Sequence, residues 1–139
     1  MIARQEIVDE ARRYLETPFL HQGRVPGACL DCAGVVVCAA QSLGLSGEYI
    51  DITDYPRDPA TQKMVDILDR HLDKIPFEKA LPGDVLLLAW AQNPQHLAIF
   101  TGIGTIIHAH EDARRVVETR LTKELIRCIR GTYRFRGIS

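Results

Sequence analysis

Cys32 is the residue whose surroundings best suit nucleophilic chemistry. It follows Asp31 and precedes two small residues, Ala33 and Gly34. A helix is predicted over residues 32–43, which places Cys32 in the first turn, where unpaired amide groups and the helix dipole favour a thiolate over a thiol. A thiolate attacks carbonyl carbon, and the Cys32 amide is a candidate donor to the oxyanion. Taken alone, however, a cysteine at a helix start is more often simply a small buried residue.

A cysteine nucleophile needs a histidine that takes the thiol proton and later protonates the leaving amine. His96 opens a predicted strand, and His108 lies on the next one. If residues 102–104 form a three-residue hairpin loop, positions whose numbers sum to an even value share a face of the sheet. His96 and His108 then become diagonal neighbours, and His108 can orient the imidazole of His96 as the third group of a triad. His110 has the same parity, so it remains an alternative third residue.

Helices are predicted mainly in the first half of the chain. Pro18 ends the first helical pattern, Gly44 is the expected C-terminal cap of the second, and Asp58-Pro59 reads as the start of a third. The predicted helices are residues 2–16, residues 32–43, the helix that begins at Asp58-Pro59, and a short one over residues 121–128. Residues 19–30 form a long loop, which is typical of a binding loop rather than a connector.

Strands are predicted after Pro82-Gly83-Asp84, which reads as a turn. They are expected over residues 85–90, 96–101, 105–109, 115–119 and 131–136, with a loop over residues 91–95. Helices first and an antiparallel meander second indicate an α+β fold. At 139 residues, the chain fits one domain, residues 1–139, because two separate cores would each be too small.

Composition excludes several classes of protein. The formal net charge is −1, and the basic residues form no stripe, so nucleic-acid binding has no support. The longest apolar runs are far shorter than the roughly 20 residues of a membrane-spanning helix. The first ten residues lack the apolar stretch of a secretory signal, so the four cysteines are expected to be free thiols.

Several ordered motifs resemble those of the NlpC-type cell-wall peptidases, which are papain-like cysteine hydrolases. The motifs are Thr-Pro-Phe-Leu-His-Gln-Gly, Asp-Cys-Ala-Gly, Pro-Gly-Asp-Val-Leu, His-Leu-Ala-Ile-Phe and Ile-Ile-His-Ala, and they run from about residue 11 to residue 117. The first of them is most similar to the branch found with phage tail proteins. The resemblance implies N-terminal helices packed on an antiparallel sheet, with the active cleft between the cysteine helix and the histidine strands.

The resemblance also implies roles for individual residues. Cys32 becomes the nucleophile, His96 the general base and His108 the orienting residue, while Asp31 and the loop from Phe19 onward line the substrate groove. Two positions depart from the family pattern, because phenylalanine replaces the usual tyrosine at position 19 and alanine replaces serine at position 33. His21 is a candidate replacement for the donor that Phe19 lacks.

The activity implied is hydrolysis of the bond between D-glutamate and the diamino acid of a peptidoglycan stem, through a thioester and without a cofactor. Stem peptides are then the substrate, phage tail proteins are possible partners, and the site of action is the cell wall or a virion. An amidase or acyltransferase with the same chemistry is an alternative, and so is an inactive module that only binds.

Cys29 and Cys32 also form a C-x-x-C pair, which elsewhere indicates zinc or redox chemistry. Cys38 and Cys128 do not supply the second closely spaced pair that a structural zinc site needs. A redox site of the thioredoxin kind needs a preceding strand, where this chain has a loop rich in proline and glycine. We therefore expect no metal.

Overall fold

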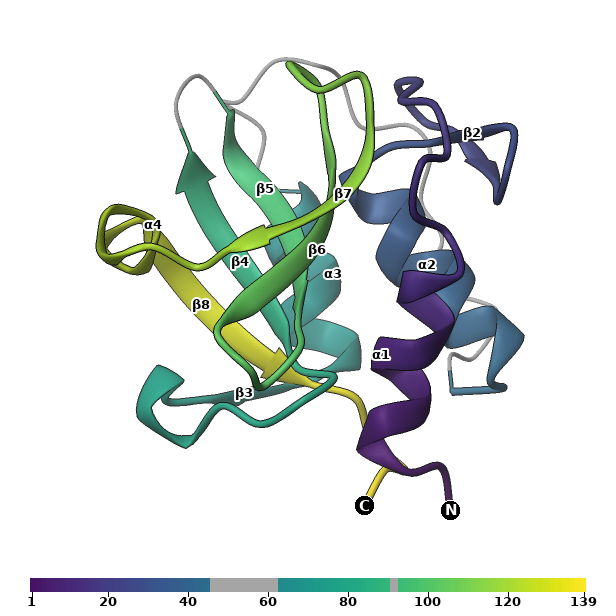
Figure 1. Cartoon of the computed structure of the whole chain (residues 1–139). Helices are drawn as coiled ribbons and strands as arrows, with labels where there is room; N and C mark the ends of the chain where they lie inside the picture. Colours follow the sequence, from purple (N-terminus) through teal and green to yellow (C-terminus); the bar gives the residue numbers. More distant parts are fainter. Residues whose placement is uncertain (46–62, 91–92) are drawn as a thin grey trace.

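Two helices pack against one face of an antiparallel sheet (Figure 1). The computed structural model describes residues 1–45, 63–90 and 93–139. The helices are α1 (Arg4–Arg12) and α2 (Cys32–Ser42). α3 (Lys63–His71) contributes Met64 and Leu68 to the same core, whereas the short α4 (Lys123–Arg127) lies on the other side of the sheet with Leu125.

The sheet has six strands in the described part of the chain, in the order β3-β8-β4-β5-β6-β7, and every neighbouring pair is antiparallel. Its strands are β3 (Asp73–Ile75), β4 (Val85–Trp90), β5 (Asn93–Phe100), β6 (Thr105–His110), β7 (Arg115–Arg120) and β8 (Ile129–Arg134). A 3-10 turn, Phe77–Lys79, follows β3. A separate small hairpin, β1 (Arg24–Val25) with β2 (Cys29–Leu30), lies within the 19–30 loop.

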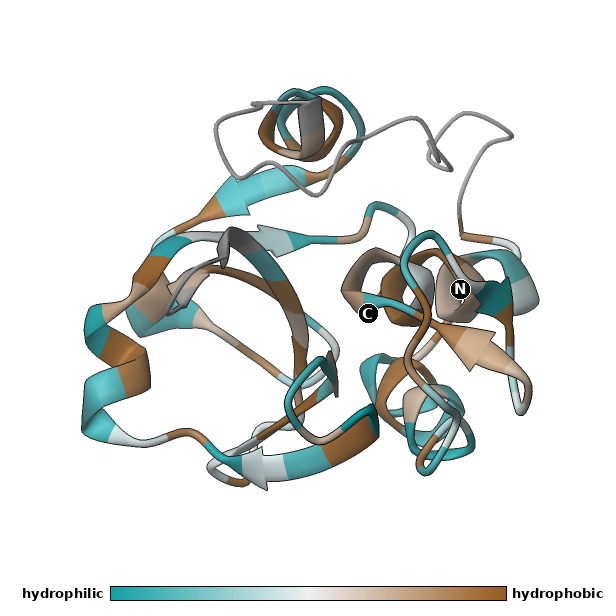
Figure 2. Cartoon of the chain, turned by 90° about the horizontal axis from the view of Figure 1, so that it is seen from above, coloured by the Kyte–Doolittle hydropathy of each residue, from teal (hydrophilic) through white to brown (hydrophobic). Residues whose placement is uncertain are grey.

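Both faces of the sheet are covered by apolar side chains. Alternate residues of a strand point to opposite faces, so Val85, Leu87, Leu97 and Ile99 join the core beneath α1 and α2. A second, smaller cluster fills the other face; its buried members are Leu86, Leu88, Ala98 and Ile106. Seen from above, the sheet is curved, and the N-terminal helices lie outside the curve (Figure 2).

α2 is the central helix, because its residues from Cys32 to Ala40 are all buried. Asp31 caps its first turn by accepting a hydrogen bond from the amide of Gly34 at 2.8 Å. Gly44, with φ of 69°, ends it in the left-handed conformation that glycine adopts readily. The bonds from Gly44 to Gln41 and from Leu45 to Ala40 satisfy the last carbonyls, which is the Schellman arrangement.

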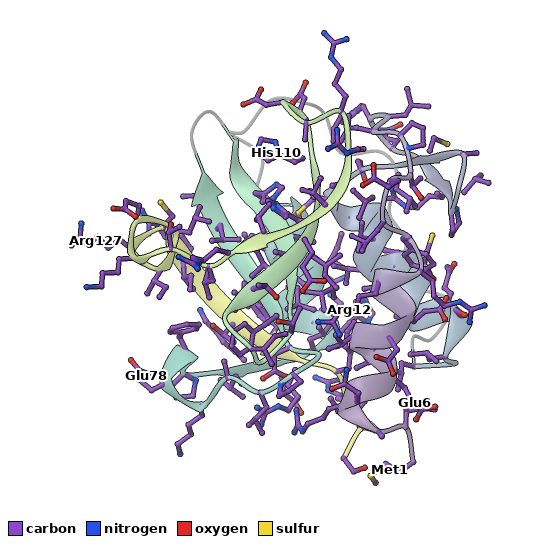
Figure 3. The ribbon with its side chains drawn as sticks, viewed as in Figure 1. Met1, Glu6, Arg12, Glu78, His110 and Arg127 are labelled. Atoms are coloured by element: carbon purple, nitrogen blue, oxygen red, sulfur yellow. The ribbon has the colours of Figure 1, made fainter. Side chains whose placement is uncertain are left out.

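The two ends of the chain lie beside each other (Figure 1). Ile2 and Ile138 form a parallel bridge, and Ser139 exchanges backbone hydrogen bonds with Ile2 and Arg4 at 2.9 and 3.1 Å. Arg4 also reaches the fully buried Asp84, whose carboxylate accepts from Arg134 at 2.8 and 3.1 Å. These contacts close the fold at the end opposite β6's His110 (Figure 3).

The predicted α+β class and helix-on-sheet arrangement are confirmed, with the cysteine helix beginning at residue 32 as expected. Residues 91–95 are not all loop as predicted, because β5 begins at Asn93 and pairs it with Trp90. The closing strand runs from Ile129 to Arg134 rather than over residues 131–136, and α1 is shorter than residues 2–16. β1, β2 and β3 were not predicted, since such short strands carry too few residues to show a period. The expected start of α3 at Asp58-Pro59 lies outside the described residues.

Gly34 is the point where the 19–30 loop touches α2. A methyl group added there would collide with the carbonyl oxygen of Gly23 and approach a Leu30 side-chain carbon at 3.1 Å. In an ordinary helix, Gly→Ala stabilises by up to about 1 kcal/mol. Here we expect Gly34→Ala to lower the free energy of unfolding by about 1–3 kcal/mol, the usual cost of overpacking, measured by urea denaturation.

The matched control is Gln41→Ala, an exposed position on the same helix. It should stay within about 0.5 kcal/mol of the parent. A Gly34→Ala protein as stable as the parent would show that the loop does not rest against α2 as described.

Candidate active site

Cys32 lies at the N-terminus of α2, with 7% of its surface exposed. Its sulfur is within hydrogen-bonding reach of two backbone amides, those of Leu97 and Ala33, and both act to lower the pKa of the thiol. Leu97 belongs to β5 and is the neighbour of His96. The packing of α2 against β5 therefore brings the sulfur to the strand that carries the predicted base.

The carboxylate of Asp31 holds three parts of the chain together. One oxygen accepts from the Gly34 amide at 2.8 Å and from the Arg24 guanidinium at 2.9 Å, and the other accepts from the Gln22 amide at 2.8 Å. Gln22 has φ of 64°, a left-handed conformation that this bond helps to hold. Only 3% of Asp31 is exposed. Its described contacts therefore fix the loop against the helix.

His96, on β5, and His108, on β6, are in direct contact. In the part of the chain that the structure describes, these strands pair at Ile99–Ile107 and at Phe100–Ile106, and beyond those pairs their ribbons diverge (Figure 1). Nε2 of His96 lies 2.7 Å from Nδ1 of His108, and the two rings meet edge to face. This is the diagonal contact that the three-residue hairpin loop predicts. The contact uses Nε2 of His96, and Nδ1 is the other ring nitrogen of that residue.

His108 has a further partner in Thr119, which sequence reasoning missed. Nε2 of His108 lies 2.9 Å from the Thr119 hydroxyl, on β7. Because Ile106 pairs with Thr119, Thr119 is the diagonal neighbour of His108, just as His108 is of His96. The same parity argument would have found it, but it requires the register of β6 with β7, and the loop between them is too irregular to fix that register from sequence.

Burial keeps both Cys32 and His96 uncharged. It raises the pKa of Cys32 to about 12, with the Asp31 charge adding to the effect. It also lowers the pKa of His96 well below 6.5, with the neighbouring His108 and His110 acting in the same direction. The pKa of His108 falls to about 4 for the same reasons. In the free protein the Cys32 thiol and the two imidazoles thus rest in their neutral forms, and Cys32 is not the thiolate expected from the helix N-terminus.

The remaining predicted site residues lie around this centre in different ways. Phe19 is half-buried, packs on the main core and bridges to Leu30. His21 lies in the tight turn closed by the bond from Gly23 to Leu20 at 2.8 Å. Neither contacts the histidine pair in any described interaction. His110 lies at the end of β6 (Figure 3). Its ring centre is 5.5 Å from that of His108, and its Nδ1 accepts a hydrogen bond from the backbone amide of Asp112.

The four cysteines are free thiols. Cys38 donates to the Arg24 carbonyl at 3.4 Å and Cys128 to the Glu124 carbonyl at 3.3 Å. Among residues 1–45, 63–90 and 93–139, no three histidine, cysteine or acidic side chains are grouped to hold a metal ion. In the same ranges no helix is long and apolar enough to cross a membrane.

The raised pKa of Cys32 makes a prediction for alkylation. Since the thiol is protonated at neutral pH, each pH unit below its pKa changes the thiolate fraction tenfold. We expect its rate with iodoacetamide, read by peptide mass spectrometry, to rise about tenfold per pH unit from pH 7 to 10. A rate that levels off below pH 8 would instead show a thiolate–imidazolium pair.

The histidine pair makes a prediction for stability. The pKa of His108 is about 4 in the folded chain, against about 6.5 when unfolded, so the unfolded chain binds more protons between these values. The free energy of unfolding should therefore fall as the pH drops from 6.5 to 4, by about 3 kcal/mol from His108 alone. Urea denaturation at several pH values measures this, and His108→Asn should have a flatter profile; equal slopes would contradict the assignment.

Solved structures similar to this chain share its fold. An NlpC/P60 family protein from Bacillus cereus has a TM-score of 0.70 at 23% identity, and the match covers 96% of this chain and 40% of that one. The NlpC/p60 domain of the peptidoglycan hydrolase SagA has a TM-score of 0.69 at 22% identity, covering 96% of this chain and 100% of the domain. This chain thus spans less than half of the Bacillus cereus protein but the whole of the SagA domain.

RipD from Mycobacterium tuberculosis, described as a non-catalytic NlpC/p60 domain protein adapted to peptidoglycan binding, has a TM-score of 0.62 at 15% identity and covers 94% of this chain and 95% of its own. At such identities the likeness establishes the fold alone. No curated protein matches the sequence. The model of the NlpC/P60 family matches residues 16–128, a span that contains Cys32, both histidines of the pair and Thr119. The chain therefore belongs to the NlpC/P60 family.

Proposed function

We propose that this chain is a cysteine peptidase that hydrolyses the D-glutamyl–diamino acid bond of peptidoglycan stem peptides. The observation that carries the proposal is the 2.7 Å contact between His96 and His108, and it is supported by the reach of the Cys32 sulfur to the amide of Leu97, the residue after His96. A nucleophile, a base and a group that orients the base are the three parts that cysteine hydrolysis requires. Family membership supplies peptidoglycan as the substrate class.

The first step is attack by Cys32 on the carbonyl carbon. Because His96 is neutral and Nε2 is occupied by His108, Nδ1 is the nitrogen that takes the thiol proton as the carbon–sulfur bond forms. The Cys32 amide, in the first turn of α2, is the candidate donor to the oxyanion. Since neither group ionises readily by itself, proton transfer and attack proceed together.

The second half of the reaction releases the products. The His96 imidazolium returns its proton to the leaving amine as the carbon–nitrogen bond breaks, which leaves a thioester on Cys32. Water then attacks the thioester while His96 accepts its proton. As the carbon–sulfur bond breaks, His96 returns that proton to the Cys32 sulfur, and the stem carboxyl group is released. Asp31 acts throughout by holding the loop and the helix start. Its place in the substrate groove, with Phe19 and His21, remains part of the proposal.

Incubation with purified muropeptides, followed by mass spectrometry of the products, tests this function. We expect cleavage between D-glutamate and the diamino acid, with Cys32→Ser at least about a thousandfold slower and His96→Ala about 10²–10⁴-fold slower. The matched control is Cys29→Ser, the half-buried partner in the C-x-x-C pair. It should keep the parent's rate, whereas a redox or zinc role would make both cysteines necessary.

Other outcomes would replace the proposal. Cleavage of a different amide, or acyl transfer to an added amine, would assign the same thioester chemistry to another substrate. Muropeptide binding without any cleavage by the parent protein would indicate a non-catalytic wall-binding module. The association with phage tails rests on the Thr-Pro-Phe-Leu-His-Gln segment alone and is a prediction that sedimentation of the chain with purified virions would check.

A further inference from the structure

Thr119 ends a line of three side chains that begins at the proposed base. Nε2 of His96 contacts Nδ1 of His108 at 2.7 Å, and Nε2 of His108 contacts the Thr119 hydroxyl at 2.9 Å. His96 is 5% exposed and His108 0%. Each of these two hydrogen bonds requires one donor and one acceptor. A neutral imidazole carries one proton, so the position of the proton on one histidine decides its position on the other.

Only one arrangement of protons leaves His96 able to act as a base. If Nε2 of His96 donates to His108, then Nδ1 of His96 carries a lone pair and can accept the thiol proton. His108 must then hold its own proton on Nε2, which donates to the Thr119 hydroxyl. In the reverse arrangement Thr119 donates, His108 donates to His96, and the neutral His96 carries its proton on Nδ1, where it cannot act as a base.

We propose that Thr119 is a positioning residue that accepts a hydrogen bond from His108 and thereby sets the tautomers of both histidines. Thr119 is half-buried on β7, so its own hydroxyl hydrogen can turn toward solvent while its oxygen accepts. The catalytic importance of this inference rests on the proposed function. The tautomers themselves do not, because they exist whether or not a substrate is cleaved.

Thr119→Val keeps the shape of the side chain and removes the acceptor. The Thr119 hydroxyl that receives the Nε2–H of His108 is then lost, and the arrangement with the proton on Nδ1 of His108 becomes competitive. We expect kcat on the muropeptide to fall about tenfold with KM unchanged, since about one hydrogen bond's free energy is lost from the reacting form. Thr119→Ser, which restores the hydroxyl, should recover most of the rate.

The decisive readout is the long-range ¹H–¹⁵N spectrum of the histidine rings in the full chain at neutral pH. It distinguishes protonated from unprotonated ring nitrogens residue by residue. We expect Nε2–H on both His96 and His108 in the parent and in Thr119→Ser, and mixed tautomers in Thr119→Val. The matched control is Thr105→Val, which removes a hydroxyl from β6 that donates to Glu118 at 2.7 Å, away from the histidines. Its tautomers should equal those of the parent.

The two proposals fail separately. A parent protein that cleaves muropeptides but carries the proton on Nδ1 of His108, or a Thr119→Val variant with unchanged tautomers, would overturn the role of Thr119 and leave the peptidase intact. A parent with the expected tautomers that cleaves nothing would overturn the peptidase and leave the hydrogen-bonded line intact. A Thr119→Val variant that loses activity only in proportion to its folded fraction, with Thr119→Ser no better, would also overturn the role.

Discussion

The carboxylate of Asp31 is the interaction on which the rest of the site depends. It caps the helix that begins at Cys32, pairs with Arg24, and binds the Gln22 amide in the 19–30 loop. The helix start, the 19–30 loop and the position of Cys32 are therefore fixed by one buried side chain. Since breaking a buried ion pair leaves the partner charge uncompensated, this arrangement tolerates little change. It also places a negative charge beside the sulfur, which opposes the effect of the helix N-terminus on the thiol.

Burial makes the centre of the candidate site uncharged. Cys32, His96 and His108 are all buried, and their pKa values move toward the neutral form in each case. Such a centre stabilises charge poorly unless charge and counter-charge appear together. In the proposed reaction, transfer of a proton from the Cys32 sulfur to the His96 imidazole would produce two opposite charges together, which burial penalises less than one charge alone. Burial thus opposes ionisation of Cys32 or His96 alone more strongly than it opposes the proposed proton transfer between them.

Local patterns were sufficient to predict the parts of this structure that depend on neighbours in sequence. Asp31 before a run of small residues marks the start of α2, and the Gly102 and Gly104 turn fixes the parity that brings His96 to His108. The β1–β2 hairpin, β3 and the Thr119 contact depend on which distant segments pair, and short strands give no period from which to infer it. The raised pKa of Cys32 could not be predicted either, because its burial arises from β5 packing on α2 rather than from the residues around the cysteine.

The pairing of the chain ends has a consequence for the topology of the molecule. Ile2 bridges Ile138, and Ser139 bonds to Arg4, at the end of the fold opposite His110 (Figure 3). A short peptide linking the ends would therefore close the chain into a ring without moving the histidines. Ends that adjoin at the surface are the usual condition for circular permutation and for insertion into a loop of another protein. The order of the helices and strands along the chain can thus be changed by permutation while the site residues keep their positions in the fold.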